Sequence, residues 1–181
     1  MKKGEKWRME NGELIMENYS KFNWFLLTGF FSGLLPKAPG TWGSLTASLM
    51  AYAIIVYFPN PAVTIWLLAI FFSVVGIKLV NDYEAKGGIH DDKRIVIDEF
   101  AGVLISIGLF GDLKHDTFIK IILTFLAFRF FDITKPSIIG KIDKKAPGGL
   151  GVMGDDILAG IFGGILAALM YMGYLKIKGP L

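Results

Sequence analysis

The sequence lacks cysteine and carries little charge. None of its 181 residues is cysteine, so disulfide bonds, thiolate metal sites and cysteine nucleophiles are all excluded. Charged residues make up only 19% of the chain, whereas 53% of the residues are hydrophobic. That balance is too apolar for an ordinary soluble domain and favours a protein embedded in a membrane.

The sequence has no dense basic stripe, and we expect no signal peptide. The net charge of +3 is modest, so no nucleic-acid partner is expected. The first part of the chain is polar and of mixed charge, and no short apolar core with a cleavage pattern follows it. We therefore expect residues 1–21 to form a polar N-terminal extension and residues 22–181 to form a single membrane-embedded domain.

Five apolar stretches predict helices. They are Thr41–Phe58, Ala62–Ile77, Val96–Phe110, Phe118–Phe131 and Ile157–Leu175. A membrane-spanning helix needs about 20 apolar residues, so the third and fourth stretches must tilt, recruit flanking residues or be buried by other helices. An earlier stretch, Phe22–Leu35, is interrupted by small and polar residues and favours an interfacial or re-entrant helix. The predicted fold class is therefore all-α, a polytopic membrane bundle of about five apolar helices.

Alternating these stretches across a membrane sorts the charges onto two sides. Six, three and four Lys and Arg residues fall in residues 1–40, 81–94 and 132–156, which share one side. Only three fall on the other side: Lys114, Lys176 and Lys178. The excess marks the first side as cytoplasmic. Of the two histidines only His90 lies there, which excludes a lipid phosphatase that needs two histidines on one face.

Five acids lie on this same side, at the ends of apolar stretches. An Asp at the centre of a spanning helix costs about 2.5–3.5 kcal/mol, so acids gathered at helix ends suggest a site for a hard divalent cation such as Mg²⁺. Asp98 and Glu99 are adjacent and point about 100° apart on a helix, so we expect only one of them to meet the metal directly. Gly148–Gly154 predicts a flexible loop, after which Asp155 and Asp156 open the last helix. The alternative is a purely structural role, in which these acids cap helices or are stabilised by the helix macrodipole at the N-terminus.

Basic and hydroxyl residues flank the acids. Lys37 and Thr41 lie in a proline- and glycine-rich loop that enters a helix, where free N–H groups can bind an anion; an ordinary loop with Thr41 as N-cap is the alternative. Arg129 and Asp132 are spaced i, i+3, so they can simply pair. Equally, Asp132 can ligate a metal while Arg129 and Lys135 bind a phosphate. A phospholipid with a terminal phosphate is the natural substrate of such a site at a membrane surface.

Four segments of the chain resemble the signature blocks of the phosphatidylglycerophosphatase A family. They are LLPKAPGTWGSL, IHDDKRIVIDEFAG, FRFFDITKP and GGLGVMGDDILAGI, in this order. The resemblance implies Mg²⁺-dependent hydrolysis of phosphatidylglycerophosphate to phosphatidylglycerol and phosphate, at the cytoplasmic face of the bacterial inner membrane. The chain departs from the family pattern after Pro136, where a second proline is usual, and at Gly154, where a larger apolar residue is common. Neither position is a candidate ligand.

The resemblance also implies roles for individual residues. The implied metal ligands are Asp91, Asp98, Glu99, Asp132, Asp155 and Asp156. The implied catalytic residues are Asp98, Glu99, Asp132 and Asp156. The implied phosphate-binding residues are Lys37, Thr41, Arg129 and Lys135.

Two other functions are compatible with clustered acids in a membrane protein. One is a non-catalytic cation-binding or transport protein, although acids at one surface rather than through the depth of the bundle argue against conduction. The other is a different Mg²⁺-dependent phospholipid-headgroup enzyme, such as a CDP-alcohol phosphatidyltransferase, whose long Asp/Gly/Ala/Arg pattern is missing here. The partners expected are thus a phospholipid substrate and the membrane.

Overall fold

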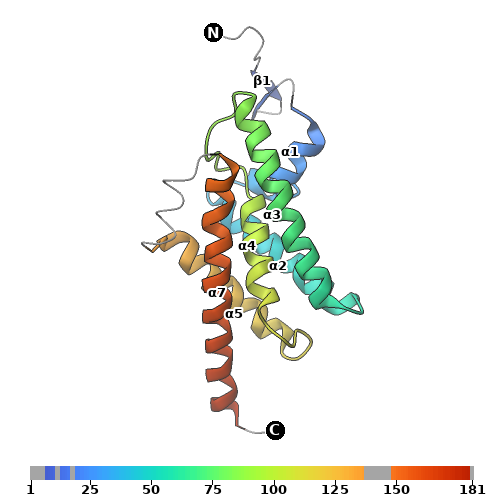
Figure 1. Ribbon diagram of the computed structural model, residues 1–181, viewed down its shortest axis with the longest axis vertical. Coiled ribbons are helices and arrows are strands. Elements are labelled where there is room, and N and C mark those ends of the chain that lie inside the picture. The colour runs from blue at the N-terminus through green and yellow to red at the C-terminus, as the bar shows by residue number, and fades with distance from the viewer. Residues whose placement is uncertain (1–6, 11–12, 17–18, 137–147, 180–181) are drawn as a thin grey trace.

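The computed structural model describes residues 7–10, 13–16, 19–136 and 148–179. In these ranges the regular secondary structure is helical apart from one short hairpin (Figure 1). The helices are α1 (Lys21–Leu27), the 3₁₀ helix η1 (Ser32–Leu34), α2 (Pro39–Tyr57), α3 (Pro61–Ala85), α4 (Ile97–Gly108), α5 (Thr117–Thr134) and α7 (Gly149–Lys178). The hairpin pairs β1 (Trp7–Glu10) with β2 (Glu13–Met16) in antiparallel register. Sequence analysis predicted a polar extension there and no strands.

Prolines set the boundary between α2 and α3. Pro39 and Pro61 each occupy the first turn of a helix. Backbone N–H groups in the first turn have no partner within the helix, so a proline there costs no hydrogen bond. α2 ends at Tyr57, two residues before Pro59, because the residue before a proline is disfavoured in helical conformation. The predicted break between the first two apolar stretches is therefore observed.

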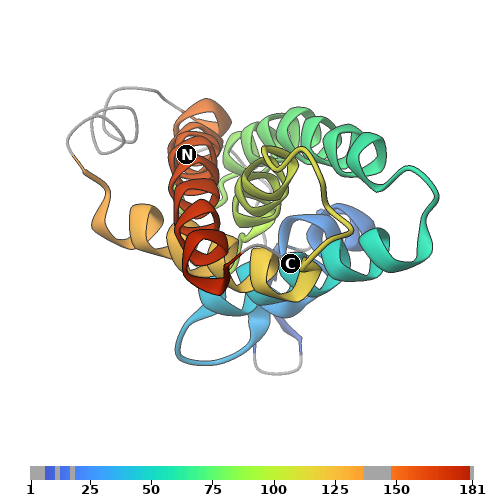
Figure 2. The ribbon, with the colours of Figure 1, turned by 90° about the horizontal axis from the view of Figure 1, so that it is seen from below.

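α4 lies in the middle of the bundle. It has 12 residues, of which ten are buried, and at 1.5 Å per residue it is only about 18 Å long. It contacts α2, α3, α5 and α7, and the view along the bundle shows it enclosed by its neighbours (Figure 2). The third apolar stretch is thus a short helix covered by other helices, one of the three possibilities that its length left open.

Two of the helices in the described ranges, α3 and α7, are long and apolar enough to cross a membrane by length and composition. About a third or less of each apolar segment is buried against the rest of the protein, 33% in α3 and 28% in α7. Large apolar side chains are exposed along both, among them Leu67, Ile70, Phe71, Ile165 and Leu169. Such a surface is unsuited to water and is typical of a lipid-facing helix.

Glycines bring α4 and α7 into backbone contact. A Cβ atom built on Gly160 would lie 2.4 Å from the carbonyl oxygen of Gly102, far inside the van der Waals distance. Small residues at such a crossing let two helices approach closely. Asp156 stands one turn before Gly160, so this contact also sets the distance between the acid on α7 and the first turn of α4.

α7 begins at Gly149, so the prediction of a flexible glycine loop through Gly154 is wrong. The N–H of Gly149 donates to Oδ1 of Asn81 over 2.8 Å, and a Cβ on Gly149 would lie 2.3 Å from the carbonyl oxygen of Ile77. Met153 is fully buried in the core. Each helical glycine costs about 1 kcal/mol relative to alanine, and packing against α3 offsets that cost here.

Candidate active site

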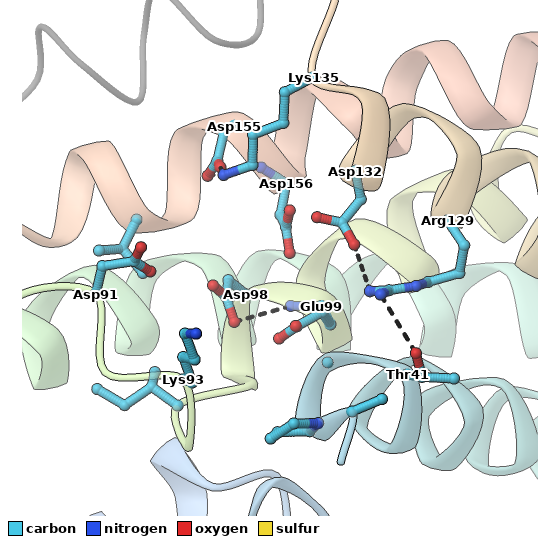
Figure 3. Close-up of a pocket in the computed structure, with 15 residues that line it drawn as sticks. Thr41, Asp91, Lys93, Asp98, Glu99, Arg129, Asp132, Lys135, Asp155 and Asp156 are labelled. Carbon is cyan, nitrogen blue, oxygen red and sulfur yellow. Dashed lines mark hydrogen bonds and ion pairs between the residues drawn. The ribbon is translucent and has the colours of Figure 1, made fainter.

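A pocket of about 220 Å³ opens where the ends of several helices meet (Figure 3). Its walls come from the start of α2, the loop before α4, the first turn of α4, the last two turns of α5 and the first two turns of α7. Six carboxylates line it: Asp91, Asp98, Glu99, Asp132, Asp155 and Asp156. Three cations do so as well: Lys93, Arg129 and Lys135. The structure therefore gathers acids that are up to 65 positions apart in the sequence.

Three of these acids form a tight group, which we call the three-acid cluster. Asp98, Glu99 and Asp156 each offer a carboxylate oxygen, and these oxygens lie within 4.8 Å of one another. Asp98 and Glu99 thus both bring an oxygen to one point although they are adjacent on the helix, and direct metal contact by only one of them stays a prediction. Glu99 has one more methylene than Asp98, so its carboxylate reaches the same point from a different direction on the helix.

The chemistry of the three-acid cluster fits a hard divalent cation. Glu99 is buried, and its Oε2 has no hydrogen-bond partner among the described residues. Burying an ionised carboxylate without a partner is costly, and like charges this close repel one another. A cation bound between the three oxygens would remove both penalties, and an all-oxygen donor set is the kind that Mg²⁺ prefers.

Asp132 and Arg129 stand beside the three-acid cluster and pair with each other. Nη1 of Arg129 donates to Oδ2 of Asp132, while its Nη2 donates to Oγ1 of Thr41 over 3.4 Å. Nη1 also lies 3.4 Å from Oγ of Ser44. The i, i+3 pairing that the sequence allowed is present, yet the guanidinium still faces the pocket at the N-terminus of α2.

Asp155 is neutralised by Lys135. Nζ of Lys135 lies 2.5 Å from Oδ2 of Asp155, whose side chain is only 6% exposed. The other oxygen of Asp155 accepts the backbone N–H of Asp156 over 3.0 Å. Asp155 thus borders the three-acid cluster without belonging to it.

Gly40 allows α2 to approach the three-acid cluster. A Cβ atom on Gly40 would lie 2.3 Å from Oε1 of Glu99 and 3.2 Å from Nη1 of Arg129. Only a residue without a side chain leaves both groups where they are. Gly40 lines the pocket together with Thr41.

The remaining predicted residues lie at the edge of the pocket or outside it. Asp91 is exposed but lines the pocket, whereas Lys37 is exposed and is not among the lining residues. Lys93 lines the pocket although sequence analysis did not single it out. Its position within HDDKR, two residues after Asp91 in a signature block, is the signal that could have identified it.

An ion pair between the buried Asp92 and the partly exposed Arg94 holds the loop that carries Asp91 and Lys93. Arg94 donates to both oxygens of Asp92, over 3.0 and 2.7 Å, and the hydroxyl of Tyr83 donates to Oδ2 over 2.7 Å. Burial acts to raise the pKa of Asp92, but the hydrogen bonds from Arg94 and Tyr83 outweigh it and hold that pKa below its ordinary value. The loop backbone is therefore fixed on both sides of Lys93.

The chain is similar to proteins of one enzyme family. Residues 25–171 match the family model described as Phosphatidylglycerophosphatase A. A phosphatidylglycerophosphatase A of Haemophilus influenzae is 39% identical over 149 residues, 81% of this chain and 87% of the relative. The Escherichia coli phosphatidylglycerophosphatase A is 35% identical over 150 residues, 82% of this chain and 81% of the relative.

A third relative carries a different description. It is a Bacteroides thetaiotaomicron protein named "Putative phosphatidylinositol-3-phosphatase", 40% identical over 144 residues, 78% of this chain and 89% of the relative. The comparison with solved structures gave no match.

Proposed function

The chain belongs to the phosphatidylglycerophosphatase A family and is a phosphatidylglycerophosphatase of phospholipid biosynthesis, and we propose that its acidic pocket binds Mg²⁺ and presents the terminal phosphate of the lipid to water. The observation that carries the proposal is the buried, unpartnered oxygen of Glu99 beside two further carboxylates. In this pocket an arginine and a helix N-terminus face the acids. A protein that only transports cations would need neither of these anion-binding groups.

The residues that would hold the ion are Asp98, Glu99 and Asp156. Asp91 and Asp155 lie around them as further candidate ligands, whereas Asp132 is assigned to proton transfer. When bound, Mg²⁺ supplies charge neutralisation of the phosphate and lowers the pKa of a water molecule.

The phosphate side of the pocket is formed by Arg129, Thr41 and the N-terminus of α2. A guanidinium offers several donors in a fixed geometry that suits phosphate oxygens, and helix N-terminal N–H groups favour an anion. Lys135 adds a further positive charge at the mouth of the pocket. These groups orient the phosphomonoester against the three-acid cluster. Lys37, outside the pocket lining, can contribute only long-range attraction in this arrangement.

Asp132 is placed to take a proton from the attacking water. It stands between Asp156 and Arg129 (Figure 3), and its contact with Arg129 fixes its orientation. As the water oxygen bonds to phosphorus, its proton passes to the Asp132 carboxylate. The bond from phosphorus to the glycerol oxygen breaks, and the departing oxygen takes up a proton from bulk water, to which Asp132 then returns the proton it accepted. The products are phosphate and phosphatidylglycerol.

The substrate class is a phospholipid whose headgroup ends in a phosphomonoester. Phosphatidylglycerophosphate is such a lipid, and so is the phosphatidylinositol 3-phosphate named for one relative. In both, the terminal phosphate lies beyond a phosphodiester that joins the headgroup to diacylglycerol. The family and two of the relatives favour phosphatidylglycerophosphate for this chain.

Mg²⁺ binding is expected to stabilise the folded protein. A ligand at about 100 times its Kd adds about 2.7 kcal/mol to the free energy of unfolding, which thermal unfolding in detergent would measure as a saturable rise in Tm. Asp156→Asn should abolish this rise. Without metal the variant should be no less stable than the wild type, because the substitution removes charge repulsion within the three-acid cluster.

The matched control is Asp112→Asn. Asp112 is an exposed acid in the loop between α4 and α5, and it does not line the acidic pocket. This variant should keep the full Mg²⁺ effect. A Tm rise that survives in Asp156→Asn would place the metal elsewhere.

The localisation proposed is the bacterial inner membrane, with several helices spanning it, α1 at the interface and the pocket on the cytoplasmic face. The ends of the helices support this arrangement. Trp66, near the start of α3, donates to the carbonyl oxygen of Gly108 at the end of α4, and Lys178, at the end of α7, lies 3.8 Å from Asp116 before α5. These contacts join helix ends that lie away from the acids. Helices that cross a membrane in alternating directions would place these ends on the side opposite the pocket.

Cysteine labelling tests this orientation, since the chain has no cysteine of its own. Lys176→Cys and Lys37→Cys place single thiols at exposed positions of the two proposed sides. In intact cells a membrane-impermeant maleimide should label position 176 and spare position 37, and inverted vesicles should reverse the pattern. Labelling of position 37 in intact cells would overturn the proposed orientation.

A further inference from the structure

We propose that Lys93 binds the bridging phosphodiester of the lipid substrate and so selects lipids that carry a second phosphate. This inference rests on the proposed function, in which the three-acid cluster and Arg129 hold the terminal phosphate. In phosphatidylglycerophosphate, a glycerol unit separates that phosphate from the phosphodiester. A second anionic group therefore enters the pocket with every substrate molecule.

Lys93 is the pocket cation best able to accept that group. Arg129 is paired with Asp132, and Lys135 is paired with Asp155. No hydrogen bond or ion pair joins the ammonium group of Lys93 to any residue that the structure describes, and the side chain is exposed to solvent. Its charge is available to a ligand without breaking a contact inside the protein.

The position of Lys93 also suits the second phosphate. Figure 3 shows Lys93 and Arg129 on opposite sides of the three-acid cluster. A terminal phosphate held between the cluster and Arg129 leaves the opposite wall of the pocket to the rest of the headgroup. Asp91 lies on that same wall, where its carboxylate can accept a hydrogen bond from the free hydroxyl of the glycerol unit.

The loop presents Lys93 on a fixed backbone. Its neighbour Asp92 is buried and receives hydrogen bonds from Arg94 and Tyr83. The guanidinium of Arg94 also lies 5.0 Å from the ring centroid of Trp24, a cation–π contact. Fixing the backbone on both sides lowers the conformational entropy that Lys93 loses on binding.

The test is the steady-state kinetics of Lys93→Met with phosphatidylglycerophosphate in mixed micelles containing Mg²⁺. Loss of one charge-assisted contact should raise KM about tenfold to 100-fold and leave kcat within about twofold of wild type. Lys93→Arg keeps the charge and should restore most of the lost affinity. Inhibition by inorganic phosphate, which reports the terminal-phosphate side alone, should be unchanged in Lys93→Met.

Lys86→Met is the matched control, because Lys86 lies on the same side of the bundle, pairs with Asp82 and does not line the pocket. Its KM should match that of the wild type. An unchanged KM in Lys93→Met overturns the inference, as does a loss of phosphate inhibition equal to the rise in KM, which would place Lys93 at the terminal phosphate. A wild-type protein that shows no Mg²⁺ dependence would instead refute the metal site.

Discussion

Asp98→Asn is expected to lower the rate of phosphate release from phosphatidylglycerophosphate by at least about 100-fold, the scale of effect when an oriented metal ligand is lost. The substitution keeps the shape of the side chain and removes its negative charge. Asp98 contributes one of the three oxygens that lie within 4.8 Å of one another, and its Oδ1 also accepts the N–H of Glu99 over 3.1 Å, a contact that asparagine can keep. The expected defect is therefore in metal affinity and turnover, with the fold retained.

Two further variants make the Asp98 result specific. Asp132→Asn should also cost at least about 100-fold, because the amide cannot take the proton of the attacking water, yet it should keep the Mg²⁺-dependent rise in Tm. Asp82→Asn removes an acid that pairs with Lys86 outside the pocket, and should leave the rate unchanged. If Asp98→Asn folds and releases phosphate at the wild-type rate, Asp98 is not part of the site.

Gly40→Ala is expected to lower the rate by about 100-fold, the loss that a displacement of about 1 Å in an active site can cause. The added methyl group would lie 2.3 Å from Oε1 of Glu99, so either the carboxylate must rotate out of the three-acid cluster or the start of α2 must retreat. A retreat of α2 would also carry Thr41 away from Arg129. In both cases a residue without a functional group would change the geometry of the site.

The control for Gly40→Ala is Gly173→Ala. Gly173 also lies in a helix, and no heavy atom stands within 4 Å of the position of its added Cβ. Alanine there should leave activity unchanged and add slightly to helix stability. Phosphate release is measured together with Tm, so that a loss of fold is separated from a loss of rate.

A double-mutant cycle locates the cause of the Gly40 effect. Glu99→Asp withdraws the carboxylate by one methylene and lowers activity by itself. If Gly40→Ala acts through Glu99, its effect should shrink markedly in the Glu99→Asp background, since the clash is then relieved. Strictly additive effects would show that Gly40→Ala acts by another route.

The helices and the grouping of the acids could be predicted from the sequence. Uncharged apolar stretches separated by prolines predicted α2 and α3. Acids at the ends of such stretches predicted that Asp98 and Glu99 would stand at a helix end, whereas Asp156 lies in the second turn of α7 rather than at its start. The length of an apolar stretch and the cost of burying an acid depend on residues that are close in the sequence, so both can be judged without coordinates. The predicted pairing of Arg129 with Asp132 is of the same local kind.

The contacts between segments could not be predicted in this way. α7 begins at Gly149 because residues of its first two turns pack against α3, although glycine by itself disfavours a helix. Whether Asp98 and Glu99 both reach one point depends on the approach of α7 and on the space left by Gly40. The inclusion of Lys93 in the pocket depends on how the Asp92–Arg94 ion pair fixes the loop before α4.

The sequence by itself therefore determined which groups are charged, where the helices run and which side of the bundle the acids share. Only the tertiary structure decided which carboxylate oxygens come within 4.8 Å of one another and which lysines line the pocket. The physical reason is that helix formation and charge sorting follow from neighbours along the chain. The geometry of a site a few ångströms wide is instead set by the close packing of helices that are far apart in sequence.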